Sequence, residues 1–165
     1  MLADYDANVN RIVAQPFLLR ATVDGQQRRH VPDYLLITDE RPVVVDVKPK
    51  RRLSNPTVAG TFAWTADVLR TRGWQHEVAT EPNGPESDNV AFLAGYRRPW
   101  LIDQELLSEL AERDRDGRTF GYAVRATAHG RPAAVRAALL HLLWRQVYTV
   151  DLTRPLAETH LLERP

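Results

Sequence analysis

The chain has 165 residues, a formal net charge of +1, an apolar fraction of 44% and no cysteine. This composition excludes a disordered tail, a collagen-like chain and a domain held together by disulfides or zinc thiolates, and the length suits one ordinary domain or a compact domain with a small appendage. No apolar run approaches the roughly 18 residues of a membrane-spanning helix, and the N-terminal residues lack the pattern of a secretory signal. We therefore expect a cytoplasmic protein that does not enter a membrane.

Basic residues are unevenly distributed and are almost all arginine. Of the 22 basic residues only two are lysine, Lys48 and Lys50. Basic residues outnumber acidic ones by seven to four in residues 28–52 and by seven to three in residues 117–165, whereas residues 76–116 hold ten acidic and four basic residues. Two mildly basic zones are the electrostatic pattern expected of a protein that binds nucleic acid.

Strand patterns dominate the first half of the chain. Asp24-Gly25 is a hairpin signal, Asp39 to Pro42 has the composition of a turn, and the β-branched run that follows suits a buried strand. The strands expected on this basis are 11–22, 28–38, 43–48 and 74–79. A helical period over 56–72 lies before the last of them, and 81–89 has the composition of a loop.

Helical patterns follow from about residue 97 onward. We expect helices over 103–113, 120–128 and 132–147, and then a short hairpin within 148–162. Three helices followed by a hairpin is the element order of a winged helix-turn-helix. The sequence therefore predicts an α/β domain over residues 1–97 and a winged-helix-like region over residues 98–165.

The most informative residues lie in two segments, His30 to Tyr34 and Val45 to Lys48. If these segments form adjacent antiparallel strands, Asp46 and Lys48 point to one face of the strand over 43–48. Asp33 then lies beside the end of that strand. Two carboxylates and the Val47 carbonyl would then form a hard oxygen site suited to Mg²⁺ or Mn²⁺. A lysine at this point can hold a water molecule or assist its deprotonation, which an arginine does poorly because its pKa is too high.

This arrangement also resembles a known family. A Pro-Asp pair followed by Asp-x-Lys is the signature of the PD-(D/E)xK, or restriction-endonuclease-like, nucleases, and His-Val-Pro-Asp-Tyr with Val-Asp-Val-Lys-Pro resembles the TnsA-like endonuclease subunit of heteromeric transposases. Four further segments are similar to the actinobacterial branch of that family: Ala14–Phe17, Gly73–Trp74, Leu93–Pro99 and Asp151–Leu156.

The resemblance implies a restriction-endonuclease-like fold and Mg²⁺-dependent (or Mn²⁺-dependent) hydrolysis of double-stranded DNA at transposon ends. It implies that Asp33 and Asp46 are catalytic metal ligands together with the Val47 carbonyl, and that Lys48 is the catalytic lysine. The partners it implies are DNA, a DDE-type transposase and an AAA+ ATPase, and a homodimer is possible. The basic residues that we expect to contact DNA are Arg28, Arg29, His30, Lys50, Arg51, Arg52, Arg136 and Arg145.

One feature departs from the family pattern. The family supplies a further glutamate from a helix before the first strand, but this chain has no Glu before Glu40. A start codon assigned too late, a truncated N-terminal helix, or substitution by Asp4 or Asp6 would each explain this difference. Three alternatives stay open: a non-catalytic DNA-binding or assembly module of the same fold, a restriction or defence nuclease of the same superfamily, and a winged-helix regulator with an α/β sensor domain.

Overall fold

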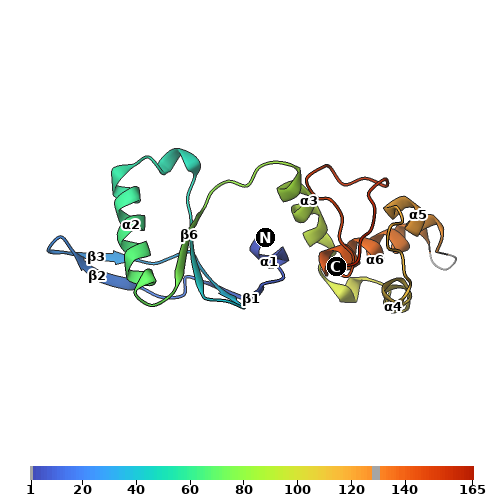
Figure 1. Ribbon diagram of the computed structural model, residues 1–165, viewed down its shortest axis with the longest axis horizontal. Coiled ribbons are helices and arrows are strands. Elements are labelled where there is room, and N and C mark those ends of the chain that lie inside the picture. Colours follow the sequence, from blue (N-terminus) through green and yellow to red (C-terminus); the bar gives the residue numbers. More distant parts are fainter. Residues whose placement is uncertain (1, 128–130) are drawn as a thin grey trace. The chain divides into compact units, whose positions relative to one another are not determined.

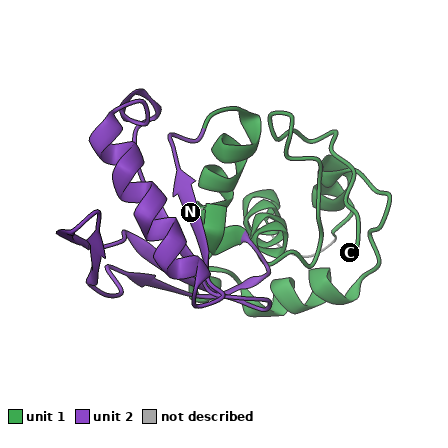
Figure 2. Ribbon diagram, turned by 60° about the vertical axis from the view of Figure 1, so that its left-hand side comes forward, with its two compact units in different colours: residues 1–5, 83–165 green, residues 6–82 purple. Residues whose placement is uncertain are grey.

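A computed structural model describes residues 2–127 and 131–165. The chain forms two compact units (Figure 2), which we call the sheet unit (residues 6–82) and the helical unit (residues 1–5 and 83–165). The chain passes from one to the other between Pro82 and Asn83, upstream of the domain boundary predicted near residue 97. Each unit has its own core of buried residues.

The sheet unit contains a mixed four-stranded sheet in the order β1-β4-β5-β6. Strand β4 is antiparallel to both β1 and β5, whereas β6 runs parallel to β5. Their bounds are Val9–Ala14 (β1), Tyr34–Thr38 (β4), Val43–Val47 (β5) and Gln75–Ala79 (β6). A separate hairpin joins β2 (Leu19–Val23) to β3 (Gln26–His30), and helix α2 (Pro56–Arg70) contacts both β6 and β2 (Figure 1). The expected α/β class with a mixed sheet and a flanking helix is confirmed.

Two of the expected strands are each divided in two by backbone that cannot continue a ladder. The first is interrupted at Gln15, which has a positive φ of 45°, and at the following Pro16. The second is interrupted at Pro32, which has no N–H to donate. The predicted hairpin turn is confirmed: Asp24 and Gly25 have φ values of 51° and 75°, the left-handed pair that a two-residue turn between twisted strands requires.

Strand β5 is the centre of the sheet unit. Its residues 43–46 are all buried, as expected for a β-branched strand with a neighbour on each side. Helix α2 contributes Trp64 and Leu69 to the same core. The helix begins where predicted because Asn55 caps it, accepting hydrogen bonds from two backbone N–H groups, and Pro56 occupies its first position.

The helical unit is built around α6 (Pro132–Trp144), most of whose second half is buried. The expected helices are confirmed with slightly shorter bounds for α4 (Gln104–Glu112), α5 (Phe120–Arg125) and α6. Residue 128, the last of the expected second helix, lies outside the described residues. Helix α3 (Pro85–Leu93) lies mostly where a loop was expected, because its first turn is Pro-Glu-Ser-Asp, a composition shared by loops and helix starts. The short elements α1 (Leu2–Tyr5), η2 (Ala94–Tyr96) and η3 (Pro99–Leu101) complete the unit, while η1 (Lys50–Arg52) belongs to the sheet unit.

The end of the chain differs from the expected hairpin. Within the described residues, two isolated antiparallel bridges join Thr119 to Leu161 and Thr149 to Glu163 in place of continuous strands. The segment is still fixed to the core, since Tyr148 and Leu162 are fully buried. The winged-helix assignment stays a prediction. Across the described ranges, no helix combines the length and apolar character needed to cross a membrane.

Candidate functional site at the end of strand β5

The register of β4 and β5 sets the two predicted aspartates at opposing positions. Tyr34 pairs with Val45, so the residues one step further along, Asp33 and Asp46, occupy opposing positions at the end of this ladder. The Asp33 side chain takes the place of a missing ladder partner: its Oδ2 accepts a hydrogen bond of 2.7 Å from the Val47 N–H. Pro32 interrupts the strand just before this point, which leaves the Asp33 side chain to complete the pairing.

Asp46 is buried and is bound by two histidines. Only 2% of its side chain is exposed, and its two oxygens lie 2.8 Å from His30 Nε2 and 2.8 Å from His76 Nε2. A carboxylate can only accept hydrogen bonds, so each imidazole must carry its proton on Nε2. We call His30, Asp46 and His76 the histidine–aspartate cluster.

The histidine–aspartate cluster strongly favours the ionised form of Asp46. Burial by itself raises the pKa of this carboxyl group, but the hydrogen bonds and charges of His30 and His76 outweigh it and lower the pKa from 3.8 to about 2. Aromatic rings of α2 enclose the imidazoles: Phe62 lies 5.8 Å from the His76 ring, and Trp64 lies 6.3 Å from the His30 ring. The cluster is therefore a charged network inside the sheet unit.

Lys48 follows β5 directly and is partly buried. Its backbone N–H donates to the Ala79 carbonyl, which extends the pairing of β5 with β6 by one residue. If the extended chain continues its alternation beyond β5, Lys48 lies on the same face as Asp46, and this placement stays a prediction. Lys50 differs from Lys48, since it is exposed and its backbone N–H donates to Glu81.

The predicted metal ligands fit a hard cation only in part. Asp33 and the Val47 carbonyl are oxygen donors of the type that Mg²⁺ prefers. Asp46, however, uses both oxygens to hold the two histidines. Across residues 2–127 and 131–165, no group of three or more His, Asp or Glu side chains has the arrangement of a metal site. Of the predicted ligand set, Asp33 and the Val47 carbonyl are therefore the oxygen donors that would hold such a cation.

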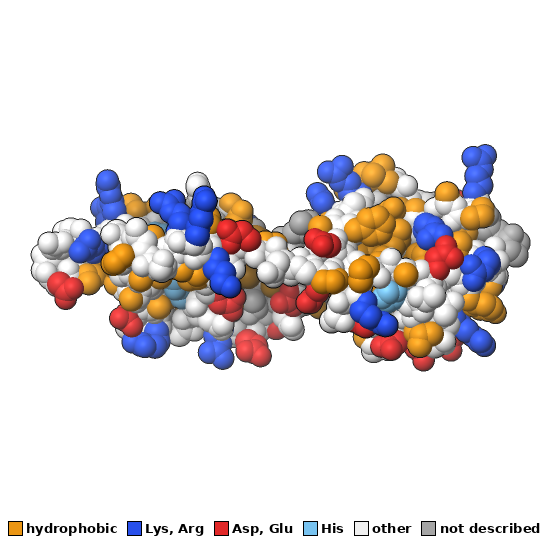
Figure 3. Space-filling model, turned by 90° about the horizontal axis from the view of Figure 1, so that it is seen from above, with side chains coloured by type: hydrophobic (Ala, Val, Ile, Leu, Met, Phe, Trp, Pro, Cys, Tyr) orange, Lys and Arg blue, Asp and Glu red, His pale blue; other side chains and the backbone are white. Residues whose placement is uncertain are grey.

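Basic side chains of the sheet unit are exposed on two of its segments. Arg28 and Arg29 lie on β3, and Lys50, Arg51 and Arg52 form η1. Arg29 is paired across the hairpin with Arg20, so two positive charges stand directly opposite each other, which destabilises the hairpin. Lys and Arg side chains extend from the surface of this unit in Figure 3, where it forms the left half of the view.

The predicted DNA contacts of the helical unit have different surroundings. Arg136 forms an ion pair with Glu158 and lies 5.6 Å from the centre of the Phe120 ring. Arg145, at the end of α6, is exposed. His141, also on α6, is only 2% exposed and bonds to the Tyr96 carbonyl, so its side chain does not reach the surface.

The segments that resemble the actinobacterial branch have structural roles. Trp74 packs on Phe17 with ring centres 5.8 Å apart, which joins two of these segments in the sheet unit. In the helical unit, Leu93 is fully buried, and the Asn89 side chain accepts from the Leu156 N–H and donates to two carbonyls of residues 152–154. These contacts explain the segments as parts of the two cores.

Sequence reasoning missed His76 as a member of the site. The sequence does contain a signal for His76. Exposed and partly buried residues alternate along β6, so that His76 and Val78 point inward. The neighbouring strand β5 has the polar Asp46 at an inward position. Two inward polar residues on adjacent buried strands need each other as partners.

Known proteins add no family assignment. A scan against protein-family models matches none of them, and a search of curated proteins finds no match for this chain.

Proposed function

We propose that this chain is a metal-dependent DNA endonuclease subunit of the PD-(D/E)xK type, acting within a heteromeric transposase together with a DDE-type transposase and an AAA+ ATPase. The observation that carries the proposal is the β4–β5 register, which sets Asp33 opposite Asp46 with Lys48 two residues further along the chain. Carboxylates that hold a metal ion and a lysine that offsets developing charge can together support hydrolysis of a phosphodiester. The exposed basic residues on β3 and η1 support contact with the DNA backbone.

The residues of the chain would divide the work as follows. Asp33 and the Val47 carbonyl would hold Mg²⁺ or Mn²⁺, which when bound supplies Lewis acidity toward the phosphate. Lys48 would orient the attacking water and offset the charge that develops on the phosphate oxygens. His30 and His76 would fix the orientation of Asp46 and keep it ionised.

The proposal is tested by the nicking of supercoiled plasmid DNA in the presence of Mg²⁺ or Mn²⁺. We expect Lys48→Ala and Asp33→Asn to abolish nicking while the circular dichroism spectrum is retained. The matched control is Asp67→Asn, which removes an exposed carboxylate on α2 that pairs only with Arg70. Nicking at equal rates by the wild type and both site variants would refute the assignment.

The histidine–aspartate cluster favours a second candidate, a non-catalytic DNA-binding or assembly module of the same fold. Here Asp46 is a structural anion that joins β3, β5 and β6 through its two histidines, which explains why both of its oxygens are occupied. This candidate predicts duplex binding that falls steeply with salt and no nicking with any divalent metal. Binding without nicking, measured with the partner proteins present, would decide in its favour.

A further inference from the structure

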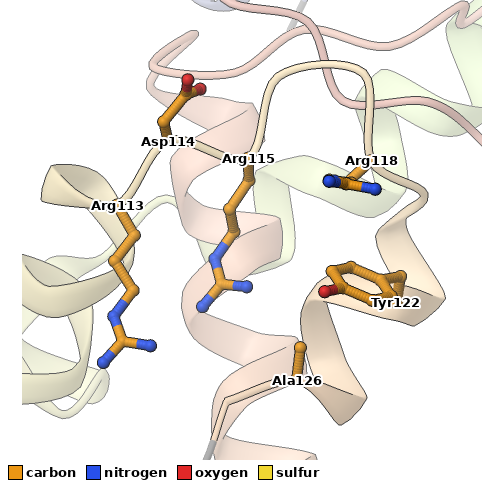
Figure 4. A pocket seen from close by; sticks show the side chains of 6 residues that line it. All are labelled: Arg113, Asp114, Arg115, Arg118, Tyr122 and Ala126. Atoms are coloured by element: carbon orange, nitrogen blue, oxygen red, sulfur yellow. The ribbon is translucent and has the colours of Figure 1, made fainter.

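The helical unit contains a pocket rich in arginine that the proposed function does not use. Its volume is about 310 Å³, and it lies between the segment that follows α4 and the helix α5 (Figure 4). The residues that line it are Arg113, Asp114, Arg115, Arg118, Tyr122 and Ala126. Three guanidinium groups thus share one pocket with a single carboxylate.

Arg115 is the central residue of this arginine pocket. It is only 5% exposed, and its one side-chain hydrogen bond within the described residues is from a terminal nitrogen to Thr127 Oγ1, at 2.9 Å. Its buried Nε has no partner in the described part of the chain. Thr127 in turn donates to the Ala123 carbonyl, so the guanidinium is held against α5 by a neutral group. A buried guanidinium that meets no carboxylate requires an anion to offset its charge.

Asp114, the acidic residue in the lining, does not offset the charge of Arg115. Asp114 Oδ1 accepts a hydrogen bond from the Asp116 N–H within its own turn. In Figure 4 its carboxylate points in the direction opposite to the side chains of Arg113 and Arg115. Arg113 already pairs with Glu109 at 3.0 Å, whereas Arg118 lies over the Tyr122 ring at 5.4 Å, a contact that orients its guanidinium without neutralising it.

We propose that the arginine pocket binds a phosphate group, contributed either by a small phosphorylated molecule or by a nucleic-acid backbone. Arginine forks match phosphate oxygens and can donate to them in pairs. Because Arg113 pairs with Glu109, the guanidiniums of Arg115 and Arg118 are the two that would meet the anion, and two positive charges suit an anion with more than one charge. The volume is at the lower end of the roughly 300–1,000 Å³ typical of ligand pockets, which leaves room for a group attached to the phosphate. This proposal does not depend on the nuclease assignment, because it concerns residues of the helical unit alone.

The first experiment measures the binding of inorganic phosphate to the full chain by calorimetry and by thermal shift, with acetate and chloride at matched ionic strength. We expect phosphate to stabilise the wild type more than acetate does. Arg118→Gln should weaken phosphate binding by about tenfold, because one charge-assisted hydrogen bond is lost. Arg115→Lys keeps the positive charge but loses the paired donors of the guanidinium, and it should also weaken phosphate binding.

The control is Arg125→Gln, which also removes one positive charge. Arg125 lies on α5 outside the pocket and pairs with Glu158. Phosphate binding by this variant should match the wild type. No preference for phosphate over acetate, or equal weakening by Arg118→Gln and Arg125→Gln, would overturn the proposal. If Arg115→Lys fails to fold, Arg118→Gln still decides, since Arg118 is exposed.

A second measurement distinguishes the two sources of the phosphate. The affinity for a duplex oligonucleotide is compared between Arg118→Gln and Arg125→Gln by fluorescence anisotropy. A larger loss in Arg118→Gln identifies the nucleic-acid backbone as the occupant of the pocket. Equal duplex affinity, combined with lost phosphate binding in Arg118→Gln, identifies a small phosphorylated molecule.

Discussion

Replacement of Asp46 by asparagine tests whether the histidine–aspartate cluster stabilises the sheet unit through charge. The pKa of Asp46 is lowered from 3.8 to about 2 by its two histidines, despite its burial. A lowered carboxyl pKa contributes stability that is present above the pKa of the unfolded chain and is lost as the pH falls through the pKa of the folded chain. At 1.36 kcal/mol per pKa unit, the contribution is about 2 kcal/mol above pH 5, and it declines between about pH 4 and pH 2.

We therefore expect Asp46→Asn to lower the free energy of unfolding by about 2 kcal/mol at pH 5 and by only about 0.5 kcal/mol at pH 2. Urea unfolding is followed by fluorescence in a chain that carries Trp100→Phe and Trp144→Phe, because the remaining Trp64 and Trp74 both lie in the sheet unit. The exposed-carboxylate control Asp67→Asn should change the free energy by less than about 0.5 kcal/mol. A destabilisation by Asp46→Asn that is equal at both pH values would show that the charge of Asp46 does not stabilise the sheet unit.

Three further predictions concern packing and backbone geometry, and thermal and urea unfolding measure each. Gly60→Ala should stabilise α2 by about 0.5–1 kcal/mol because a Cβ there meets nothing within 4 Å. Gly121→Ala should instead destabilise α5 because its Cβ would lie 2.9 Å from Glu158 Cβ. A change in the free energy of unfolding with the same sign for both variants would contradict the packing around these two positions. Gly25→Ala should cost about 1 kcal/mol, since its φ of 75° is strained for alanine, and no loss of stability would contradict the turn geometry. Tyr148→Phe should cost about 1 kcal/mol through the lost hydrogen bond to the carbonyl of residue 113, and an unchanged stability would show that this bond is not formed.

The sequence predicts the main elements of both units well because their signals are local. The Asp24-Gly25 turn, the Asn55-Pro56 helix start and the β-branched run of β5 each determine structure within a few residues. The approach of Asp33 to Asp46 was also predictable, since a short turn between antiparallel strands determines which residues face each other.

What the sequence did not predict depends on contacts between residues far apart in the chain. His30 and His76 meet at Asp46 from β3 and β6, and neither histidine has a neighbour in sequence that identifies its partner. Helix α3 was missed because proline, glutamate, serine and aspartate are as common in loops as in a first helical turn. The isolation of Arg115 from carboxylates likewise requires the folded structure, because Asp114 and Asp116 flank it in the sequence.

The central claim is that Asp33, Asp46 and Lys48 form a nucleolytic site at the end of β5. The most direct test is the rate of the first nick in supercoiled plasmid at saturating protein, with Mg²⁺ present and the partner proteins added. We expect nicking by the wild type and by Asp67→Asn, and none by Lys48→Ala, with duplex binding retained in all three. Nicking by Lys48→Ala at the wild-type rate would rule out this site, and binding without nicking in the wild type would favour the non-catalytic module instead.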